Sequence, residues 1–245
     1  MKINFQPYGD SAILINFKQK IDLVINQQVV QLAKKIEQVA FDWVQFCIPA
    51  YCSLTVGFDF KKIQYEDAVL KMQSLILSLK TEVQQPILKE KTTRILNIPV
   101  CYNDEFALDL NALSQEKQLS TQEIIELHTA KTYHVFMLGF LPGFPYLGIL
   151  PKELSYQRKA TPRTKVPARS VALAGLQTGI YPSDAPGGWQ IIGKTPLPIF
   201  LTDVKNPFLF QAGDQVNFHP ISKHDFQKIE HDIAHQTFNW QSIYG

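Results

Sequence analysis

The sequence predicts an α+β protein of two domains, a ferredoxin-like α/β domain over residues 1–90 and a β-barrel-like domain over residues 91–245. Two observations predict this fold class. Strand and helix patterns alternate along the first part of the chain, in an order typical of a ferredoxin-like unit. Farther along, more than half of the glycines and prolines lie between residues 139 and 198, where they separate short strand candidates. A chain of 245 residues is long enough for two modest domains.

The N-terminal domain starts with a strand and a helix. The apolar stretch 11–17 favours a strand, and Asp22 is an N-cap candidate for a helix over residues 23–40. The apolar residues of this helix recur at helical spacing, so they fall on one side of it. These residues are Ile25, Val29, Leu32, Ala33, Ile36 and Ala40.

Two strands, a second helix and one further strand follow. Residues 43–48 and 52–58 alternate in polarity around a turn, and helical spacing returns at Tyr65. The order β-α-β-β-α is followed by a strand candidate over residues 93–102, and this predicts the ferredoxin-like unit. The segment before that strand is polar and contains a proline, so the domain boundary is predicted near residue 90.

The C-terminal domain starts with two short helices and continues as strands. Residues 108–117 have a helical pattern, and a second helix begins with the capping box Ser120-Thr121-Gln122-Glu123. The strand candidates that follow are separated by glycine and proline, which supply the corners of a closed or bent β architecture. These candidates are residues 133–138, 170–175, 189–193, 198–201 and 215–220.

Composition limits the functions that the chain can have. Its residues are 45% hydrophobic and 19% charged, as in an ordinary globular protein. A net charge of +2 predicts neither a nucleic-acid nor a membrane partner, because such binding needs a concentrated basic face. The chain shows no secretory signal and no membrane span, so it is predicted to be cytoplasmic. No metal site is predicted, because the three cysteines have no companion at zinc-ligand spacing.

One stretch, from Gly188 to Thr195, matches the phosphate-loop pattern G-x-x-x-x-G-K-[ST]. A phosphate loop follows a buried strand and leads straight into a helix, whose N-terminal N–H groups bind the anion. Here Pro196 and Pro198 follow the pattern, and a Pro-Gly-Gly turn precedes it. Bulky β-forming residues also occupy the interior of the loop, where small residues are needed. We therefore interpret the stretch as a strand entered through a Gly-Gly turn.

Four segments resemble the family of 5-oxoprolinase B subunits. They are YGDSAILINF, IPAYCSLTVGFD, GFLPGFPYLGILP and PRTKVPARSVALAGLQTGIYPSDAPGGWQIIGKTP, and the resemblance covers roughly residues 5–220. The same family includes the sporulation-kinase inhibitor KipI and proteins called allophanate hydrolase subunit 1, and it is similar to the carboxyltransferase part of urea carboxylase. The resemblance implies an N-terminal α/β domain followed by a cyclophilin-like β-barrel.

The resemblance also implies an activity, a cofactor and partners. It implies an ATP-dependent complex that opens 5-oxo-L-proline to L-glutamate, in which this chain is the B subunit. Its partners are then the A subunit, which differs from it, and the C subunit, which is a homologous barrel. ATP is bound by the complex, and not necessarily by this chain. An alternative from the same family is an inhibitor that binds a histidine kinase. The barrel alone also suggests a prolyl isomerase, although a fold does not transmit an activity.

One segment of the sequence is rich in cations, which the binding of an anionic substrate would need. The lactam carries a carboxylate and develops negative charge as it reacts. Five cations and no acidic residue lie between Arg158 and Arg169. Arg163 and Lys165 are the candidate catalytic residues among them, because a planar guanidinium on a proline-restrained loop suits a carboxylate or a phosphate. Arg158 and Lys159 are interpreted as surface charges, and a solvated loop is the alternative for the whole segment.

The predicted site has the cationic segment on one side, and aromatic residues and glycines are predicted to form its other side. Gln177 and Thr178 offer hydrogen bonds to a lactam amide, and Tyr181 and Trp189 offer flat apolar faces. Glycines allow the chain to turn tightly beside a ligand. In the alternative interpretation, the aromatic residues only fill the barrel. The candidate substrate-binding residues are Phe144, Gln177, Thr178, Tyr181, Gly187, Gly188 and Trp189.

Two histidines lie near the matching segments. Either His128, on a predicted helix, or His134, on a predicted strand, could serve as a general base, because imidazole titrates near neutral pH. His134 is the third candidate catalytic residue. The alternative for both is a structural, hydrogen-bonded histidine, because no aspartate or serine partner stands at a fixed offset.

Arg169 departs from the family pattern, which has a glycine at this position. If the backbone there is left-handed, an arginine is strained by roughly 1 kcal/mol or more. The loop is therefore expected to differ locally from that of its relatives.

Overall fold

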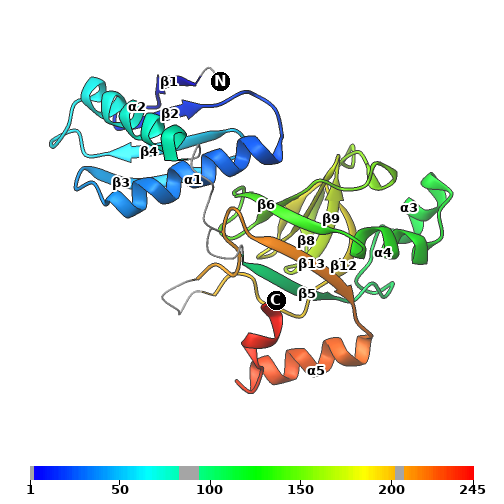
Figure 1. The fold of residues 1–245 in the computed structure, drawn as a ribbon. Helices are drawn as coiled ribbons and strands as arrows, with labels where there is room; N and C mark the ends of the chain where they lie inside the picture. Colours follow the sequence, from blue (N-terminus) through cyan, green and yellow to red (C-terminus); the bar gives the residue numbers. More distant parts are fainter. Residues whose placement is uncertain (1–2, 83–93, 202–206) are drawn as a thin grey trace. The chain divides into compact units, whose positions relative to one another are not determined.

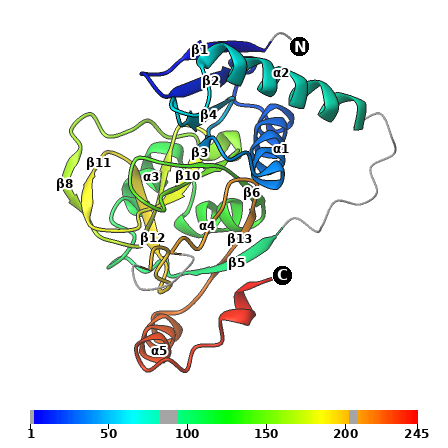
Figure 2. The same ribbon diagram turned by 90° about the vertical axis from the view of Figure 1, so that its left-hand side faces the viewer.

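The computed structural model describes residues 3–82, 94–201 and 207–245. The chain divides into two compact units, Met1–Thr93 and Arg94–Gly245 (Figures 1 and 2), and each is described by itself. The boundary predicted near residue 90 lies outside the described residues. Among the helices that the structure describes, none is long and apolar enough to cross a membrane.

The first unit is a four-stranded antiparallel sheet with two helices. Its sheet order is β1-β2-β4-β3, and the apolar sides of both helices pack on one face of the two central strands. The predicted N-cap is confirmed, because the Asp22 carboxylate accepts hydrogen bonds from the N–H groups of Val24 (3.0 Å) and Ile25 (3.3 Å). The elements are β1 Asn4–Pro7, β2 Ala12–Asn16, α1 Leu23–Val39, β3 Val44–Pro49, β4 Ser53–Phe58 and α2 Tyr65–Glu82.

The strand that follows α2 does not return to this sheet, so the ferredoxin-like prediction is not confirmed. The edge beside β2 is occupied instead by β1, a short and mostly exposed strand that the sequence pattern did not indicate. The expected fourth strand, β5 (Ile95–Val100), pairs in parallel with β13 (Gln215–Pro220) in the second unit. An alternating pattern indicates an extended chain, but it does not indicate which sheet the chain joins.

The second unit is built on a curled seven-stranded sheet of order β12-β9-β10-β7-β6-β13-β5 (Figure 1). All pairings are antiparallel except that of β13 with β5. Just beyond β5, Cys101 exchanges two backbone hydrogen bonds with Lys194 of β12, at 2.8 and 3.0 Å. The two edge strands therefore meet, and the sheet curls into part of a barrel. The other strands are β6 Thr132–Leu138, β7 Pro145–Gly148, β9 Ser170–Ala174, β10 Gln177–Ile180 and β12 Gln190–Lys194.

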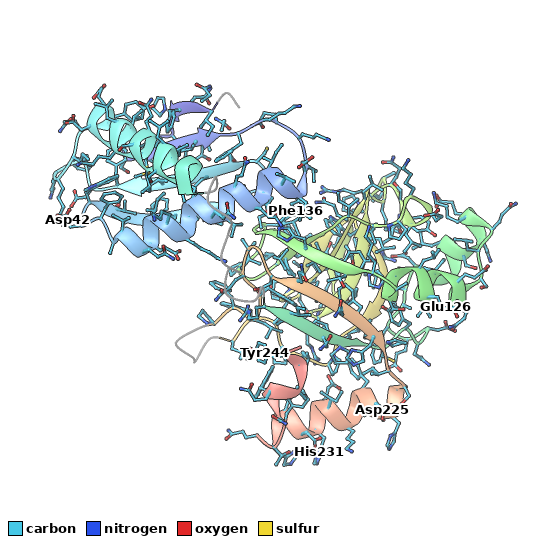
Figure 3. All side chains as sticks on the ribbon, viewed as in Figure 1. Asp42, Glu126, Phe136, Asp225, His231 and Tyr244 are labelled. Carbon is cyan, nitrogen blue, oxygen red and sulfur yellow. The ribbon has the colours of Figure 1, made fainter. Side chains whose placement is uncertain are left out.

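Helices and a separate two-stranded ribbon complete this unit. The predicted capping box is confirmed at Ser120, whose side chain and backbone both bond with Glu123. The helix α5 carries histidines such as His231 on its exposed side (Figure 3). Apolar residues of α3 and α4 join the main core with the inner side chains of the sheet. The remaining elements are α3 Leu110–Lys117, α4 Thr121–Thr129, α5 Lys223–Ala234 and the ribbon of β8 Arg163–Val166 with β11 Ala185–Gly187.

Four of the five strand predictions in this unit are confirmed, as β6, β9, β12 and β13. The fifth, residues 198–201, is wrong. Phe200 makes only an isolated bridge with Phe208, because the prolines at 196 and 198 cannot donate to a ladder.

Candidate functional site

Five aromatic side chains, on strand β7 and on the segments between strands, form an aromatic cluster in the second unit: Phe140, Phe144, Tyr146, Tyr181 and Trp189. The Phe144 ring is central, with its centroid 5.2 Å from that of Tyr181, 5.4 Å from that of Trp189 and 5.0 Å from that of Tyr146. Phe144 and Tyr181 are 1% exposed and Trp189 is 5% exposed, whereas Phe140 is 61% exposed. The predicted aromatic residues are thus together, but their rings fill the space between them and form a floor instead of an open cleft.

Two glycines make room for these rings. A Cβ on Gly187 would lie 2.2 Å from the Tyr181 hydroxyl oxygen, and a Cβ on Gly179 would lie 2.8 Å from the Phe144 ring. No side chain fits at such distances, so glycine is required at both positions. Gly188 is less crowded, and its carbonyl accepts a hydrogen bond from the Lys159 N–H at 2.7 Å. Of the two glycines predicted to line a ligand, Gly187 therefore abuts the aromatic cluster, whereas Gly188 faces Lys159 and Pro162.

A buried carboxylate, Asp109, lies beside this cluster and accepts hydrogen bonds from three residues, and we call this arrangement the Asp109 clamp. Arg163 donates two of these bonds, at 2.9 and 2.8 Å, and Lys159 donates one at 2.9 Å. The Ile191 N–H of β12 donates another at 2.7 Å. Burial alone would raise the pKa of Asp109, but these donors outweigh it and hold the pKa below its usual range. The clamp therefore joins the start of α3, the loop before β8 and the edge strand β12.

The clamp changes what the predicted cations can do. Arg163 is near enough to Tyr181 for its charge to oppose the rise in the pKa of that hydroxyl, but its guanidinium already binds Asp109 on two nitrogens. Lys165 pairs with Asp184 instead of Asp109, at 2.8 Å, and 68% of its side chain is exposed. Catalytic roles for both residues stay predictions.

Arg158, which sequence reasoning assigned to the surface, lies over the aromatic cluster. Its side chain is exposed, and its guanidinium carbon is 5.8 Å from the centre of the Trp189 ring. Its positive charge opposes the effect of burial, which raises the pKa of Tyr146 and of Tyr181. No signal in the sequence distinguishes Arg158 from Lys159, because they are adjacent cations in the same loop.

Thr178 and His128 belong to a buried chain of hydrogen bonds. The Tyr102 hydroxyl is 2.8 Å from His128 Nδ1, and His128 Nε2 is 3.1 Å from the Thr178 hydroxyl, which donates to the Ala172 carbonyl at 3.2 Å. Every group is satisfied when Tyr102 donates to Nδ1 and Nε2–H donates to Thr178. Burial lowers the pKa of His128 to about 3. The hydroxyl of Thr178 is thus used inside the core, where it is fully buried.

His134 and Gln177 lie one row away from the aromatic cluster, on the same face of the sheet. His134 of β6 and Gln177 of β10 both lie opposite Gly148 of β7, which is two residues beyond Tyr146 on the same strand. Two strand residues span about 7 Å. Burial lowers the pKa of His134 to about 4, so this imidazole is neutral near pH 7. The structure therefore places both residues outside the aromatic cluster.

The phosphate-loop pattern is a strand, as interpreted from the sequence. Lys194 N–H donates to the Cys101 carbonyl and Thr195 N–H donates to the Arg169 carbonyl, both at 3.0 Å. Ile191 N–H is bound by Asp109. The Lys194 ammonium lies 5.5 Å from the centre of the Phe106 ring. Because these backbone donors are already used, the stretch cannot cradle a phosphate.

Arg169 has the left-handed backbone that a glycine would favour, with φ of 68°. Its guanidinium donates to the Pro196 carbonyl at 2.9 Å and pairs with Glu230 of α5 at 2.8 Å. The expected local strain is therefore present, and these two contacts offset part of it.

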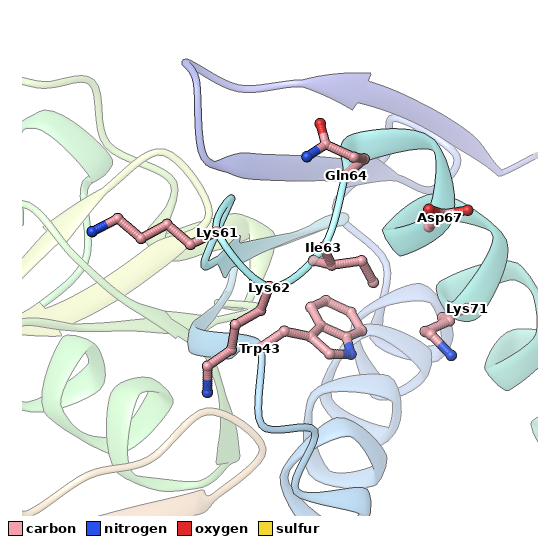
Figure 4. A pocket seen from close by; sticks show the side chains of 7 residues that line it. All are labelled: Trp43, Lys61, Lys62, Ile63, Gln64, Asp67 and Lys71. Atoms are coloured by element: carbon pink, nitrogen blue, oxygen red, sulfur yellow. The ribbon is translucent and has the colours of Figure 1, made fainter.

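A pocket of about 530 Å³ lies in the first unit and contains none of the predicted site residues. Its floor is Trp43 and Ile63, and the side chains of Lys61, Lys62 and Lys71 extend from its rim in different directions (Figure 4). Lys62 donates to the Asp42 carbonyl at 2.7 Å. The cations do not converge on one point, so the pocket supplies no common anion site.

Comparisons with known proteins agree on one family. Residues 3–210 match the model for the carboxyltransferase domain, subdomain C and D. The chain is 41% identical to the 5-oxoprolinase B subunit of Bacillus subtilis, over 95% of this chain and 98% of that protein. The crystal structure of TTHA0988 is similar with a TM-score of 0.74 and 29% identity, but 86% of this chain spans only 40% of that longer chain. The Kluyveromyces lactis urea amidolyase shares the fold, at 19% identity and a TM-score of 0.75, over 97% of this chain and 16% of that one.

Neutralising Asp109 is expected to destabilise the second unit. Asp109→Asn leaves two partly buried cations without a counter-charge, so the free energy of unfolding should fall by about 2–4 kcal/mol, measured by urea denaturation. Asp184→Asn is the control, because Asp184 is half exposed in its pair with Lys165 and solvent screens that pair. An equal loss in both variants would contradict a special role for the Asp109 clamp.

Acid is expected to destabilise the protein through His128. Its pKa is about 3 when folded and about 6.5 when unfolded, so the unfolded chain gains a proton first as the pH falls. The His128 contribution is fully present above pH 6.5 and is lost toward pH 3, by about 1.4 kcal/mol per pH unit. His128→Gln should flatten the stability curve between pH 6.5 and 4 in urea denaturation, whereas exposed His224→Gln should not. An unchanged slope in His128→Gln would refute this assignment.

Proposed function

The chain belongs to the carboxyltransferase-domain family, subdomain C and D, and from this membership we propose that it is the B subunit of a 5-oxoprolinase. The observation that carries the proposal is the identity of 41% with a protein of that name, over nearly the full length of both chains. Two further proteins of the same name, from Haemophilus influenzae and Escherichia coli, are 37% and 35% identical. The chain is thus assigned to an amide-ring hydrolase.

The proposed reaction opens the ring of 5-oxo-L-proline to give L-glutamate. The lactam C–N bond breaks, water supplies the new carboxylate oxygen, and ATP hydrolysis to ADP and phosphate drives the opening. An unactivated amide is a poor electrophile, so coupling to phosphoryl transfer supplies the activation. The enzyme must therefore hold a carboxylate and stabilise developing negative charge. The exposed Arg158 beside the aromatic cluster supports this requirement.

We propose that ATP is bound by the complex, and not necessarily by this chain. The stretch Gly188 to Thr195 matches the phosphate-loop pattern. The N–H groups of Ile191, Lys194 and Thr195 in it already donate hydrogen bonds to other parts of the fold. Because a phosphate cradle is made of such free N–H groups, these residues do not fit a nucleotide. Because this stretch does not fit a nucleotide, we propose that a different polypeptide of the complex, such as its A subunit, binds ATP.

Partner polypeptides are part of the proposal. A chain such as TTHA0988 contains a region similar to this one within a polypeptide of which that region is 40%. When a unit occurs joined to further sequence in one protein, the separate unit elsewhere is expected to associate with a separate chain. We propose that the partners are the A subunit, which is unlike this chain, and the homologous C subunit. We also propose that the second unit is cyclophilin-like and that the complex is cytoplasmic.

Within this function the residues take different proposed roles. Arg163 is proposed to position Asp109, because its guanidinium is already bound there, and a catalytic role for it stays a prediction. The aromatic residues and their glycines provide the rigid floor of the site. Direct substrate contact by Gln177 or Thr178, and catalysis by Lys165 or His134, stay predictions. Inhibition of a histidine kinase is the alternative function, and it predicts that the chain binds the kinase and lowers its autophosphorylation.

Reconstitution tests the proposal. The purified chain alone should release no glutamate from 5-oxoproline and ATP, and release should appear when the proposed A and C subunits are added. Glutamate is measured by an enzyme-coupled assay, and the control is the same mixture without this chain. No release from the complete mixture, or equal release from the control, would overturn the proposal.

A further inference from the structure

Four of the five cations between residues 158 and 169 already have carboxylate partners. Lys159 and Arg163 bind Asp109, Lys165 binds Asp184, and Arg169 binds Glu230. Arg158 differs from them, because no carboxylate among the described residues pairs with it. A guanidinium whose charge is not compensated nearby is the strongest anion receptor in this segment.

The backbone on both sides of Arg158 is held firmly. The Gln157 carbonyl accepts a hydrogen bond from the Gln190 side chain at 2.9 Å, and the Lys159 N–H donates to the Gly188 carbonyl at 2.7 Å. The Lys159 side chain is also held, by Asp109. Arg158 therefore extends from a fixed point, and binding an anion there costs less conformational entropy than binding it at a mobile loop.

The guanidinium of Arg158 lies over one ring of the aromatic cluster, that of Trp189. Its carbon lies 5.8 Å from the centre of the Trp189 ring, a cation–π distance. The side chain is exposed, so the N–H groups of the guanidinium are accessible to a ligand. A planar anion at the N–H edges would thus meet donors fixed by the fold.

We propose that Arg158 is a substrate-binding residue that anchors a pair of anionic oxygens, either the carboxylate of 5-oxoproline or a phosphoryl group. The inference rests on the proposed function for the identity of the ligand. Its physical basis is independent of that function, because it consists of the uncompensated charge, the fixed backbone and the aromatic floor. Sequence reasoning placed Arg158 on the surface, and its exposure agrees with that, but its lack of a carboxylate partner gives it a different role from its neighbours.

The test compares Arg158→Ala and Arg158→Lys with a control, Lys152→Ala, in the reconstituted complex. Lys152 is an exposed cation nearby that lies outside the proposed site. Loss of a bidentate charge-assisted contact should raise the KM of one substrate about 10- to 100-fold in Arg158→Ala, with a smaller change in kcat. Arg158→Lys should recover only part of this loss, because an ammonium keeps the charge but not the planar fork. Lys152→Ala should behave as wild type.

The substrate whose KM rises identifies the anion. A rise for 5-oxoproline assigns the carboxylate, and a rise for ATP assigns a phosphoryl group. Calorimetric titration of the same complexes with 5-oxoproline and with inorganic phosphate separates this inference from the proposed function, because binding needs no turnover. Arg158-dependent binding without turnover would support the inference and count against the function. Unchanged KM and affinity in Arg158→Ala, equal effects in Lys152→Ala, or no anion binding by the wild-type complex would overturn the inference.

Discussion

The second unit depends on one buried carboxylate, that of Asp109. A carboxylate at 3% exposure is costly to bury unless each oxygen is satisfied, and here its partners are Arg163, Lys159 and the Ile191 N–H. These partners lie 50 to 82 positions away in the sequence. The interaction therefore fixes the loop before β8 against the edge strand β12. The hydrogen bond from the Lys159 N–H to the Gly188 carbonyl holds the same loop, next to Arg158 and Trp189 in the sequence.

Local patterns in the sequence predicted most elements of the fold but not its connections. The N-cap at Asp22 and the capping box at Ser120 are short-range hydrogen bonds, so adjacent residues suffice to predict them. The partner of β5 is set by contacts with β13, which is more than a hundred residues away. No local pattern carries that information. The edge strand β1 was missed because it is short and mostly exposed, with little apolar alternation.

The residue types of the candidate site could be predicted from the sequence, but the contacts between their side chains could not. Aromatic and cationic residue types indicated an aromatic surface beside positive charge, and the structure has both. Sequence could not show that Asp109 would bind Arg163, because that pairing joins residues 54 positions apart. Nor could the sequence distinguish Arg158 from Lys159. They differ because the Lys159 side chain reaches the carboxylate of Asp109, whereas no carboxylate among the described residues pairs with Arg158. Charge in a sequence shows how many cations are present, and only the fold shows which of them are already neutralised.

The ionisation of Asp109 in the folded protein is the most direct measure of this account. A carbon-13 NMR titration of its carboxyl group, assigned by comparison with Asp109→Asn, reports the pKa at the clamp itself. The account predicts a pKa below the value of about 3.9 found in unfolded chains, because two cations and a backbone N–H outweigh the opposing effect of burial. Titration at or above that value would mean that the carboxylate is not held by these partners, and it would contradict the account.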